Sequence, residues 1–518
     1  MGKIDVVIIG AGPAGLTAAY LLLRDYDKYN IIIIEKDNQV GGISKTVSYN
    51  GNRMDLGGHR FFTKDEKVFD IWKEIMPIQG KGSYDDIKLG IDNKEYIKGG
   101  KDPEIEDEVF LIRNRVSRIF YKKKFFDYPI SLKFKTFRNL GLGTTIVSGF
   151  SYLKSIFIKK EESNLENFYI NRFGKKLYEI FFEGYTEKLW GRNPKDIDSS
   201  WGSQRVKGIS IFEVVKNSLF KIFKIKDSNK EVSLIEQFYY PKYGPGQMWE
   251  LMASKIISMG GKIIFDADVI GVNNSKDKIN SLKYICNGKE HIIKGDIFIS
   301  SMPIKDLVNG MKRVPSRVLK VSNGLPYRDF VTIGLVLKEL KIKNETHIKT
   351  INNIVPDCWI YVQSTDVKLG RIQIFNNWSC YMPSDFNNTI SLGLEYFCNE
   401  GDDFWNLKDN KLKNLAVDEL IKMGVINSKD DVIDYHVERV QKAYPAYFDT
   451  YSEFDVVKKY LDKYSNLYCI GRNGQHRYNN MDHSMETAME CVNNIVKDVK
   501  KKDNIWDVNV EKEYHESK

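Results

Sequence analysis

The first forty residues follow a pattern of apolar runs and short breaks that predicts a strand, a turn and a helix. IDVVII (4–9) is a continuous apolar run, GAGPAG (10–15) is a glycine turn, and LTAAYLLL (16–23) continues as an apolar helix. A second run, IIIIEK (31–36), predicts a neighbouring strand. Continuous apolar runs of this length are typical of strands buried on both faces of a parallel sheet. The N-terminal region is therefore predicted to be a doubly wound α/β unit.

Three later segments belong with this predicted unit. GGKIIFDADVIGVNN (260–274) reads as a strand, GDIFISSMP (295–303) resembles a strand that returns to a nucleotide-binding domain, and NLYCIGRNG (466–474) resembles the strand and turn that close such a domain. Long stretches of chain separate these segments, so the domain is predicted to be discontinuous. Between them, CWIYVQ (358–363) and GRIQIFNNWSCYMP (370–383) predict the paired strands of a second sheet.

The glycine turn carries the chemistry of the N-terminal region. Gly10 permits the tight turn, Gly12 lets backbone N–H groups approach a pyrophosphate, and Gly15 lets the helix pack closely on the strand. Glu35 ends the second strand about twenty residues later, where a carboxylate can bind ribose hydroxyls. A glycine motif alone is a weak signal. Strand, glycines, helix, strand and acid in this order predict a dinucleotide site.

A second pair of glycines points to FAD. The stretch EKDNQVGGISKT places Gly41 and Gly42 just after the ribose-binding strand, and it resembles the second glycine motif of flavoproteins related to amine oxidases and glutathione reductase. That resemblance places Val269 near the adenine and the turn at Gly471 over the ribityl chain. It implies an α/β fold in which a discontinuous doubly wound, Rossmann-like FAD-binding domain carries a helical insertion and a mixed antiparallel-sheet substrate domain.

Composition narrows the class of protein. The chain has 518 residues, 42% of them hydrophobic, which is enough for two or three globular domains. It contains no run of about eighteen or more uncharged apolar residues. Its six cysteines form no CxxC pair, and its N-terminus enters a strand without a basic leader. These features predict a cytoplasmic protein with reduced thiols, no transmembrane segment, no signal peptide and no metal site.

The net charge of +9 bears on the partners of the protein. Most lysines are expected to form a solvated basic surface, although they could also attract an anionic substrate or an anionic membrane. No zinc-finger or RNA-binding motif supports a nucleic-acid partner. The apolar stretch Leu140–Ile158, which is followed by lysines, is expected to be a packed helix, with peripheral contact to a bilayer as the alternative. The sequence does not indicate the oligomeric state.

Several motifs in the rest of the chain resemble one family. They are LGGHRFF (56–62), GYTEKLWGRNPKDIDSSWGSQRV (184–206), YYPKYGPGQMWELMASKI (239–256), KAYPAYF (442–448) and GRNGQHRYNNMDHSMETAMECVNNIV (471–496), together with the two predicted paired strands. In this order they resemble UDP-galactopyranose mutase, above all the longer eukaryotic-type enzymes. More distantly they resemble the amine oxidase and protoporphyrinogen oxidase superfamily. The resemblance lies in motifs spread over residues 4–497 rather than in an end-to-end match.

The resemblance implies a role for individual positions. His59 matches a mobile histidine near the flavin, and Gly58 beside it lets the backbone lie close to the ring. Arg205 and Arg371 match two arginines that bind the substrate diphosphate, and His59 and these arginines form the implied catalytic set. The implied substrate-binding residues are Trp190, Tyr361, Tyr444 and Tyr478, and the implied FAD contacts near the C-terminus are Gly471, Arg472 and Asp482.

Each of these assignments has a structural alternative. His59 could be a packed loop histidine, Trp190 a packing residue, and Tyr361 and Tyr444 core aromatics with satisfied hydroxyls. Asp482 could be only the N-cap of the last helix. The sequence around Arg60 and Lys207 departs from the family pattern, so the sugar is not specified.

The implied activity is that of a flavin-dependent isomerase. It interconverts the pyranose and furanose forms of UDP-galactose or a related nucleotide sugar and supplies cell-surface polysaccharide biosynthesis. N5 of reduced FAD attacks the anomeric carbon, and NAD(P)H or another reductant keeps the flavin reduced. The alternatives are an FAD-dependent oxidoreductase of the amine oxidase or protoporphyrinogen oxidase type, which acts on an apolar substrate, and a flavin-bound protein without catalysis.

The motifs also divide the chain into expected domains. The FAD-binding domain is expected at 1–100, 236–305 and 461–500, a helical substrate domain at 101–235, a sheet substrate domain at 306–460, and a flexible tail at 501–518.

Overall fold

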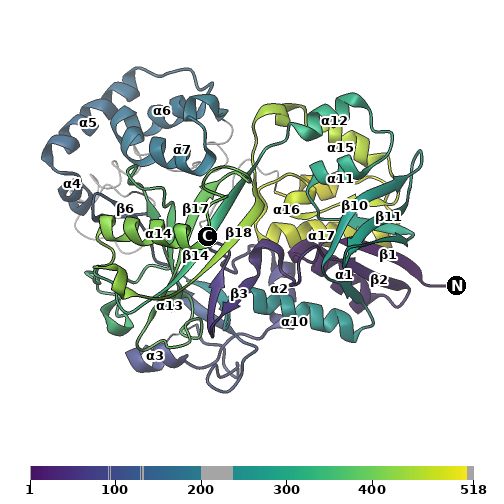
Figure 1. Ribbon diagram of the computed structural model, residues 1–518, viewed down its shortest axis with the longest axis horizontal. Helices are drawn as coiled ribbons and strands as arrows, with labels where there is room; N and C mark the ends of the chain where they lie inside the picture. Colours follow the sequence, from purple (N-terminus) through teal and green to yellow (C-terminus); the bar gives the residue numbers. More distant parts are fainter. Residues whose placement is uncertain are drawn as a thin grey trace. The chain divides into compact units, whose positions relative to one another are not determined.

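The computed structural model describes residues 2–91, 93, 95–128, 130, 134–199 and 237–509. The chain folds into two compact units, whose elements are drawn in Figure 1. Of the described residues, unit 1 contains those within 2–112, 239–329 and 440–509, and unit 2 contains those within 113–238 and 330–439. Most of the helical and sheet segments that the sequence assigns to separate domains therefore belong to one unit. Arg205 lies outside the described residues.

Unit 1 is built on a five-stranded parallel sheet in the order β19-β13-β1-β2-β9. The strands are β1 (Ile4–Ile9), β2 (Tyr29–Ile34), β9 (Lys262–Ile264), β13 (Ile297–Ser300) and β19 (Leu467–Cys469). All five lie in the apolar runs that predict strands, which confirms a discontinuous parallel sheet. Successive residues of β1 enter different cores, because Val6 and Ile8 face one side of the sheet and Val7 and Ile9 face the other.

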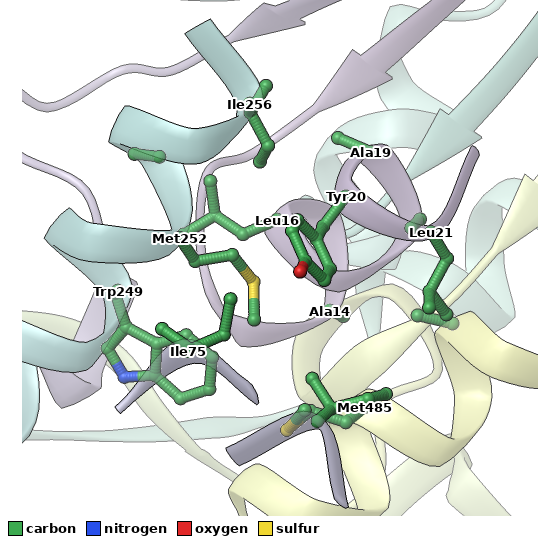
Figure 2. Packing of buried hydrophobic residues seen from close by; sticks show 14 of the residues in the cluster. Ala14, Leu16, Ala19, Tyr20, Leu21, Ile75, Trp249, Met252, Ile256 and Met485 are labelled. Atoms are coloured by element: carbon green, nitrogen blue, oxygen red, sulfur yellow. The ribbon is translucent and has the colours of Figure 1, made fainter. Parts of the chain in front are cut away.

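Helices from distant parts of the chain cover one face of this sheet. They are α1 (Pro13–Asp25), α2 (Glu66–Ile75), α10 (Pro245–Ser258) and α17 (Met481–Val496). Figure 2 shows Leu16 and Tyr20 of α1 beside Met252 of α10, with Ile75 and Met485 in the same cluster. Because α17 packs on α1, both ends of the chain contribute to one core.

The opposite face of the sheet carries a second layer. It consists of the antiparallel strands β10 (Ala267–Asn274), β11 (Ile279–Cys286) and β12 (Lys289–Lys294), and of helices α11 (Ile304–Gly310), α12 (Ser316–Asn323) and α15 (Asp455–Asp462). Smaller elements of unit 1 are the hairpin β3 (Thr46–Tyr49) and β4 (Asn52–Asp55), and the short helices α3 (Tyr84–Leu89), α16 (Gly471–Gly474) and α18 (Asp503–Asp507). Two further strands, β5 (Phe110–Asn114) and β8 (Gln237–Pro241), pair with each other.

Unit 2 is centred on a seven-stranded mixed sheet in the order β18-β14-β17-β16-β15-β6-β7. The strands are β6 (Ser117–Tyr121), β7 (Lys124–Asp127), β14 (Tyr327–Leu337), β15 (Trp359–Val362), β16 (Arg371–Ile374), β17 (Ile390–Cys398) and β18 (Val432–Pro445). As the sequence predicts, β15 pairs antiparallel with β16; it also pairs parallel with β6. The short helix α13 (Phe375–Trp378) follows β16, and α14 (Asp409–Met423) contributes Leu412 and Val417 to the core of the unit.

The remaining helices of unit 2 form a separate group. They are α4 (Phe134–Leu140), α5 (Leu142–Phe157), α6 (Leu165–Tyr178) and α7 (Gly184–Trp190), with the π-helical turn η2 (Glu179–Glu183) between the last two. Figure 1 shows α5 at the outer edge of this group. The helix predicted here is present, but the expectation that it packs its apolar side is wrong. α5 meets α6 through serines, while Phe150 and Phe157 are 71% and 83% exposed.

Candidate functional site

The turn between β1 and α1 depends on two glycines that no other residue can replace without movement. Gly10 has φ of 97°, and a Cβ at this position would lie 2.3 Å from Oγ of Ser301. A Cβ at Gly15 would lie 1.9 Å from the carbonyl oxygen of Gly10. Both distances are far below van der Waals contact, and glycine is required by the positive φ at Gly10 and by the backbone carbonyl that faces Gly15. The predicted tight turn and close helix packing are confirmed.

Gly12 and Gly42 form a surface without side chains at the N-terminus of α1. A Cβ at Gly42 would lie 3.5 Å from Cα of Gly12, and a Cβ at Gly12 would have no neighbour closer than 3.9 Å. The N–H of Gly41 donates to the carbonyl of Ala11 at 2.9 Å and holds the two turns together. No side chain caps α1 at Gly12. The N–H groups of the first helical turn therefore face this bare surface, as an anion site requires.

Glu35 braces the glycine turn from the end of β2. Its Oε2 accepts the N–H of Ala11 at 2.6 Å, and its Oε1 accepts the N–H of Asp37 at 2.9 Å. Burial raises the pKa of Glu35, and the backbone hydrogen bonds act in the opposite direction. The carboxylate is thus fixed beside the turn where a ribose is expected. The predicted contact of Val269 with adenine stays a prediction, and Val269 lies buried in β10.

His59 lies against the second glycine turn. Its Nε2 donates to the carbonyl of Leu56 at 2.8 Å, and the backbone of Ile43, next to Gly42, also hydrogen-bonds the ring. Gly57 has φ of 91°, a left-handed conformation that favours glycine. Burial, together with the nearby positive charge of Arg472, lowers the pKa of His59 to about 4, although the backbone hydrogen bonds act in the opposite direction. His59 is therefore a neutral imidazole at physiological pH, held beside the predicted cofactor turn.

Arg472 and two of the predicted substrate tyrosines form one stack. The rings of Tyr444 and Tyr478 lie 5.6 Å apart at an angle of 17°, and Cζ of Arg472 lies 4.1 Å from the Tyr478 ring centre. Nε of Arg472 donates to the carbonyl of Ala443 at 2.8 Å, and Nη1 donates to that of Asn479 at 3.0 Å. Tyr444 is buried and Tyr478 is half-buried. The structure thus brings these three predicted residues together near His59.

Helix α17 begins shortly after Tyr478 of this stack. Gly471 has φ of 74°, a Cβ there would lie 2.8 Å from Cβ of Ala14, and its N–H donates to Oγ1 of Thr487 at 2.8 Å. The N-cap of α17 is Asn480, so Asp482 belongs to the first turn and is not the cap. Burial raises the pKa of Asp482 to about 6.

A buried carboxylate that the sequence analysis missed anchors the His59 loop. Asp55 is fully buried at the end of β4 and accepts hydrogen bonds from Oγ1 of Thr46, at 2.9 Å, and from the Tyr240 hydroxyl. Oγ1 of Thr46 in turn accepts the N–H of Gly246 at 3.0 Å, in the first turn of α10. Burial raises the pKa of Asp55 to about 7. An acid directly before LGGHR is the signal that could have located it.

In unit 2, two polar side chains orient the guanidinium of Arg371. Its Nε donates to the hydroxyl of Tyr185 at 2.9 Å, and its Nη1 lies 3.2 Å from Oε2 of Glu395. Gln373 donates to the other oxygen of Glu395 at 3.1 Å. Burial raises the pKa of Glu395, whereas the charge of Arg371 opposes this effect. Arg371 is therefore held rigidly by a buried carboxylate and a phenol.

Aromatic rings surround the same guanidinium. Cζ of Arg371 lies 5.7 Å from the ring centre of Tyr361 and 5.2 Å from that of Phe397. The Tyr361 ring also lies 5.9 Å from the ring of Tyr185 and 4.4 Å from that of Tyr128. Tyr361 is half-buried, so it is not a closed core residue. Tyr361 and Arg371 were both predicted, and Tyr185 was missed although it lies in the motif GYTEKLWG.

Lys188 fixes α7, and with it Tyr185, to the sheet of unit 2. Its Nζ donates to the carbonyl groups of Val362, Ser364 and Leu369 at 3.1, 2.9 and 2.8 Å. Burial lowers the pKa of Lys188 to about 8. Trp190, at the end of α7, is 5% exposed and packs in the protein. Its predicted contact with substrate stays a prediction.

Comparisons with known proteins agree with this architecture. Residues 8–75 match the family of NAD(P)-binding Rossmann-like domains. A crystal structure of reduced UDP-galactopyranose mutase superposes over 99% of both chains with a TM-score of 0.74 and 20% sequence identity. The chain has the fold of UDP-galactopyranose mutase. This mutase fold accounts for both the parallel sheet of unit 1 and the mixed sheet of unit 2.

Two proteins with other names are also similar to this chain. A protein from Exiguobacterium sp. 255-15, provisionally named protoporphyrinogen oxidase, is similar over 96% of this chain and 100% of its own, with a TM-score of 0.64 and 14% identity. The inactive all-trans-retinol 13,14-reductase of Danio rerio is 30% identical over 123 residues. That match spans 24% of this chain and 20% of the reductase. The fold, or a stretch of the sequence, is thus shared with proteins that are not named as mutases.

Proposed function

We propose that this chain is a flavin-dependent nucleotide-sugar mutase. It interconverts the pyranose and furanose forms of UDP-galactose or a related sugar and supplies precursors of cell-surface polysaccharides. The observation that carries the proposal is the cluster of Arg371, Tyr185 and Tyr361 in unit 2. A fixed guanidinium and a phenol suit the oxygens of a diphosphate, and an aromatic face suits a sugar or a base. The mutase fold and the dinucleotide turn support the same function.

The residues of unit 1 fit FAD. The bare surface at Gly12 and Gly42 lets the diphosphate approach the N-terminus of α1, where its negative charge is favoured. Glu35 would hold the ribose of the adenosine, and the turn at Gly471 would lie along the ribityl chain. A bound reduced flavin supplies a nucleophilic nitrogen for the anomeric carbon of the sugar.

His59 acts as a neutral hydrogen-bonding group beside this cofactor turn. Because its pKa is about 4, it does not donate a proton as an imidazolium at neutral pH. Its bonds to the backbone of Leu56 and Ile43 tie the loop after β4 to the turn at Gly42. His59 therefore positions the loop, and Asp55 holds the strand from which the loop starts.

Arg371 binds the diphosphate of the substrate in unit 2. Glu395 holds the guanidinium in one orientation, and Tyr185 accepts from Nε while its own proton is available to a phosphate oxygen. Tyr361 offers a half-buried ring for the sugar or the base. Arg205 is proposed as the second diphosphate ligand on the strength of its motif, and it lies outside the described residues.

An FAD-dependent oxidoreductase acting on an apolar substrate is the second candidate. The pairing of Arg371 with buried Glu395 favours it, because the carboxylate offsets the positive charge that a diphosphate would use. Phe397 and Tyr361 also present apolar surface to the same place.

One experiment separates the two candidates. The purified protein is tested for bound flavin, reduced with dithionite, and incubated anaerobically with UDP-galactopyranose and a panel of nucleotide sugars. A mutase converts a member of the panel to its furanose isomer without net oxidation, and Arg371→Ala loses that conversion. Absence of any furanose product, with hydrogen peroxide formed from an amine or a porphyrinogen under air, would instead establish the oxidoreductase.

A further inference from the structure

Helix α5 of unit 2 has its apolar side facing outward. Five large apolar residues lie along one face at helical spacing: Leu142, Ile146, Phe150, Leu153 and Phe157, with exposed fractions of 78%, 50%, 71%, 50% and 83%. Val147 and Ile156 flank this face and Ile158 follows the end of the helix; they are 52%, 38% and 62% exposed. We call these eight residues the α5 stripe. A helix in water normally turns such a stripe toward the core, so this one requires an apolar neighbour.

The side of α5 that faces the protein is made of small polar residues. Ser148 and Ser155 are 6% and 4% exposed, and Oγ of Ser151 accepts the N–H of Lys176 in α6 at 3.0 Å. The two backbones approach so closely that a Cβ on Gly174 would lie 2.7 Å from the backbone nitrogen of Tyr152. Small residues between closely packed helices, with large apolar residues outside, are the arrangement of helices that contact lipid.

The basic residues around the α5 stripe favour binding of this helix to an anionic surface. Residues 134–160 contain five basic residues, Lys135, Arg138, Lys154, Lys159 and Lys160, and no aspartate or glutamate. Arg138 lies near one end of α5 and Lys159 and Lys160 follow the other end, all three exposed. Of the two glutamates that come next, Glu162 is paired with Arg172 at 2.7 Å. Cations beside an apolar stripe are typical of helices that lie on membranes with acidic headgroups.

The length of α5 sets how it meets the bilayer. Its 16 residues span about 24 Å at about 1.5 Å per residue, less than the hydrocarbon core of a bilayer. In the part of the chain that the structure describes, no helix is long and apolar enough to cross a membrane. We propose that α5 lies in the surface of an anionic lipid bilayer and attaches the protein to it. The grounds are the exposed α5 stripe, the small polar residues on the side that faces α6, and the basic residues around the helix. This attachment does not depend on the proposed catalytic activity.

The test is vesicle flotation of the full chain. Phosphatidylcholine vesicles with and without about one third phosphatidylglycerol are used at low and high salt. We expect partition into the anionic vesicles, weaker partition into the neutral ones, and loss of binding with salt. Phe150→Ser/Phe157→Ser should lower the partition at least tenfold. The matched control, Ile105→Ser/Ile292→Ser, removes apolar side chains that are 77% and 70% exposed elsewhere, and it should bind like the unaltered protein.

Three results would overturn the proposal. The first is no binding of the unaltered chain to anionic vesicles. The second is equal binding of the Phe150→Ser/Phe157→Ser variant. The third is a dimer of the unaltered chain, detected by light scattering without lipid, that the Phe150→Ser/Phe157→Ser variant does not form. Such a dimer would assign the α5 stripe to contact with a second copy of the chain. Both variants touch only exposed residues, and their flavin content and melting temperature check that each is folded.

A local probe provides an independent readout. A bimane label on Phe150→Cys, in a chain carrying Cys286→Ser, reports on the stripe, because the other five cysteines are buried. Its emission should shift to the blue with anionic vesicles, whereas a label on Ile105→Cys should not respond. A label at 150 that stays in a watery environment would contradict insertion of α5.

Discussion

Arg371 and Glu395 lie opposite each other on the paired strands β16 and β17, with Nη1 of the arginine 3.2 Å from Oε2 of the glutamate. The carboxylate side chain is 1% exposed and the guanidinium side chain is 18% exposed. The buried Glu395 therefore orients the guanidinium of Arg371, and part of the guanidinium side chain stays accessible to solvent. Removing one member of a buried pair leaves an uncompensated charge and costs about 3–5 kcal/mol of unfolding free energy.

Replacing Arg371 by alanine should weaken the binding of UDP tenfold or more, or about 1.4 kcal/mol, because the diphosphate loses a guanidinium. Isothermal titration calorimetry measures the affinity. Arg439→Ala is the control, since Arg439 is another unit 2 arginine paired with a carboxylate, that of Asp409. The double variant Arg371→Ala/Glu395→Gln relieves the buried charge and separates misfolding from lost affinity. Unchanged UDP affinity in the folded double variant would remove the diphosphate assignment. Arg205→Ala should weaken the binding of UDP to the same degree.

His59→Ala should retain FAD and lose most turnover, because the loop after β4 loses its bonds to Leu56 and Ile43. Flavin absorbance gives the content and the furanose assay gives the rate. With a pKa of about 4, His59 stays neutral, so the rate should show no step from this group between about pH 5.5 and 8. His291→Ala, which alters a histidine on β12, is the control. Normal turnover of His59→Ala would reduce this histidine to a packing residue.

Gly12→Ala should fold and yet lose its cofactor. The new methyl group meets nothing closer than 3.9 Å in the protein, but it fills the bare surface where a diphosphate would lie. The predicted result is at least a tenfold loss of flavin affinity with little change in the melting temperature of the apoprotein. Gly149→Ala in α5 also adds a methyl in open space, and it should retain flavin. Gly12→Ala protein that purifies with full flavin would contradict the site.

Asp55 should make the unfolding free energy fall as pH rises from about 4 to about 7. Its pKa is raised from 3.8 to about 7 by burial, so in this window the folded state binds more protons than the unfolded state. Stability is then lost with rising pH, and the loss is complete above the folded pKa. Urea unfolding at several pH values measures the slope. In Asp55→Asn the slope should be smaller than in the unaltered protein; an equal slope would show that Asp55 is ionised throughout.

The elements of unit 1 were predictable because buried parallel strands leave apolar runs and tight turns leave glycines. Gly10, Gly15 and Gly471 carry this signal in the sequence, since each takes a conformation or a contact that other residues resist. The pairing of β15 with β16 followed from two neighbouring apolar runs in the same way. Local pattern therefore determined these parts of the fold.

The partners of the charged residues were not predictable, because they come from distant segments of the chain. Glu395 lies in the apolar strand β17, and nothing in its local sequence indicates a partner. The pairing of β17 with β16 brings it opposite Arg371. Tyr185 reaches Arg371 from α7, which Lys188 ties to the end of β15 at Val362 and to the following loop at Leu369. The orientation of α5 was also hidden, since periodicity shows that a helix has an apolar face and not what that face contacts.

The order of strands in unit 1 has a consequence for synthesis of the protein. β13 lies between β1 and β19, so among the described residues its outer edge pairs with Leu467–Cys469. A ribosome has translated about nine tenths of the 518 residues before this edge can close, and α17, which packs on α1, emerges later still. The exposed edge and the apolar surface of α1 that α17 later covers would leave the nascent chain prone to aggregation. Chaperone supply during translation should therefore limit the yield of folded protein more than its final stability does.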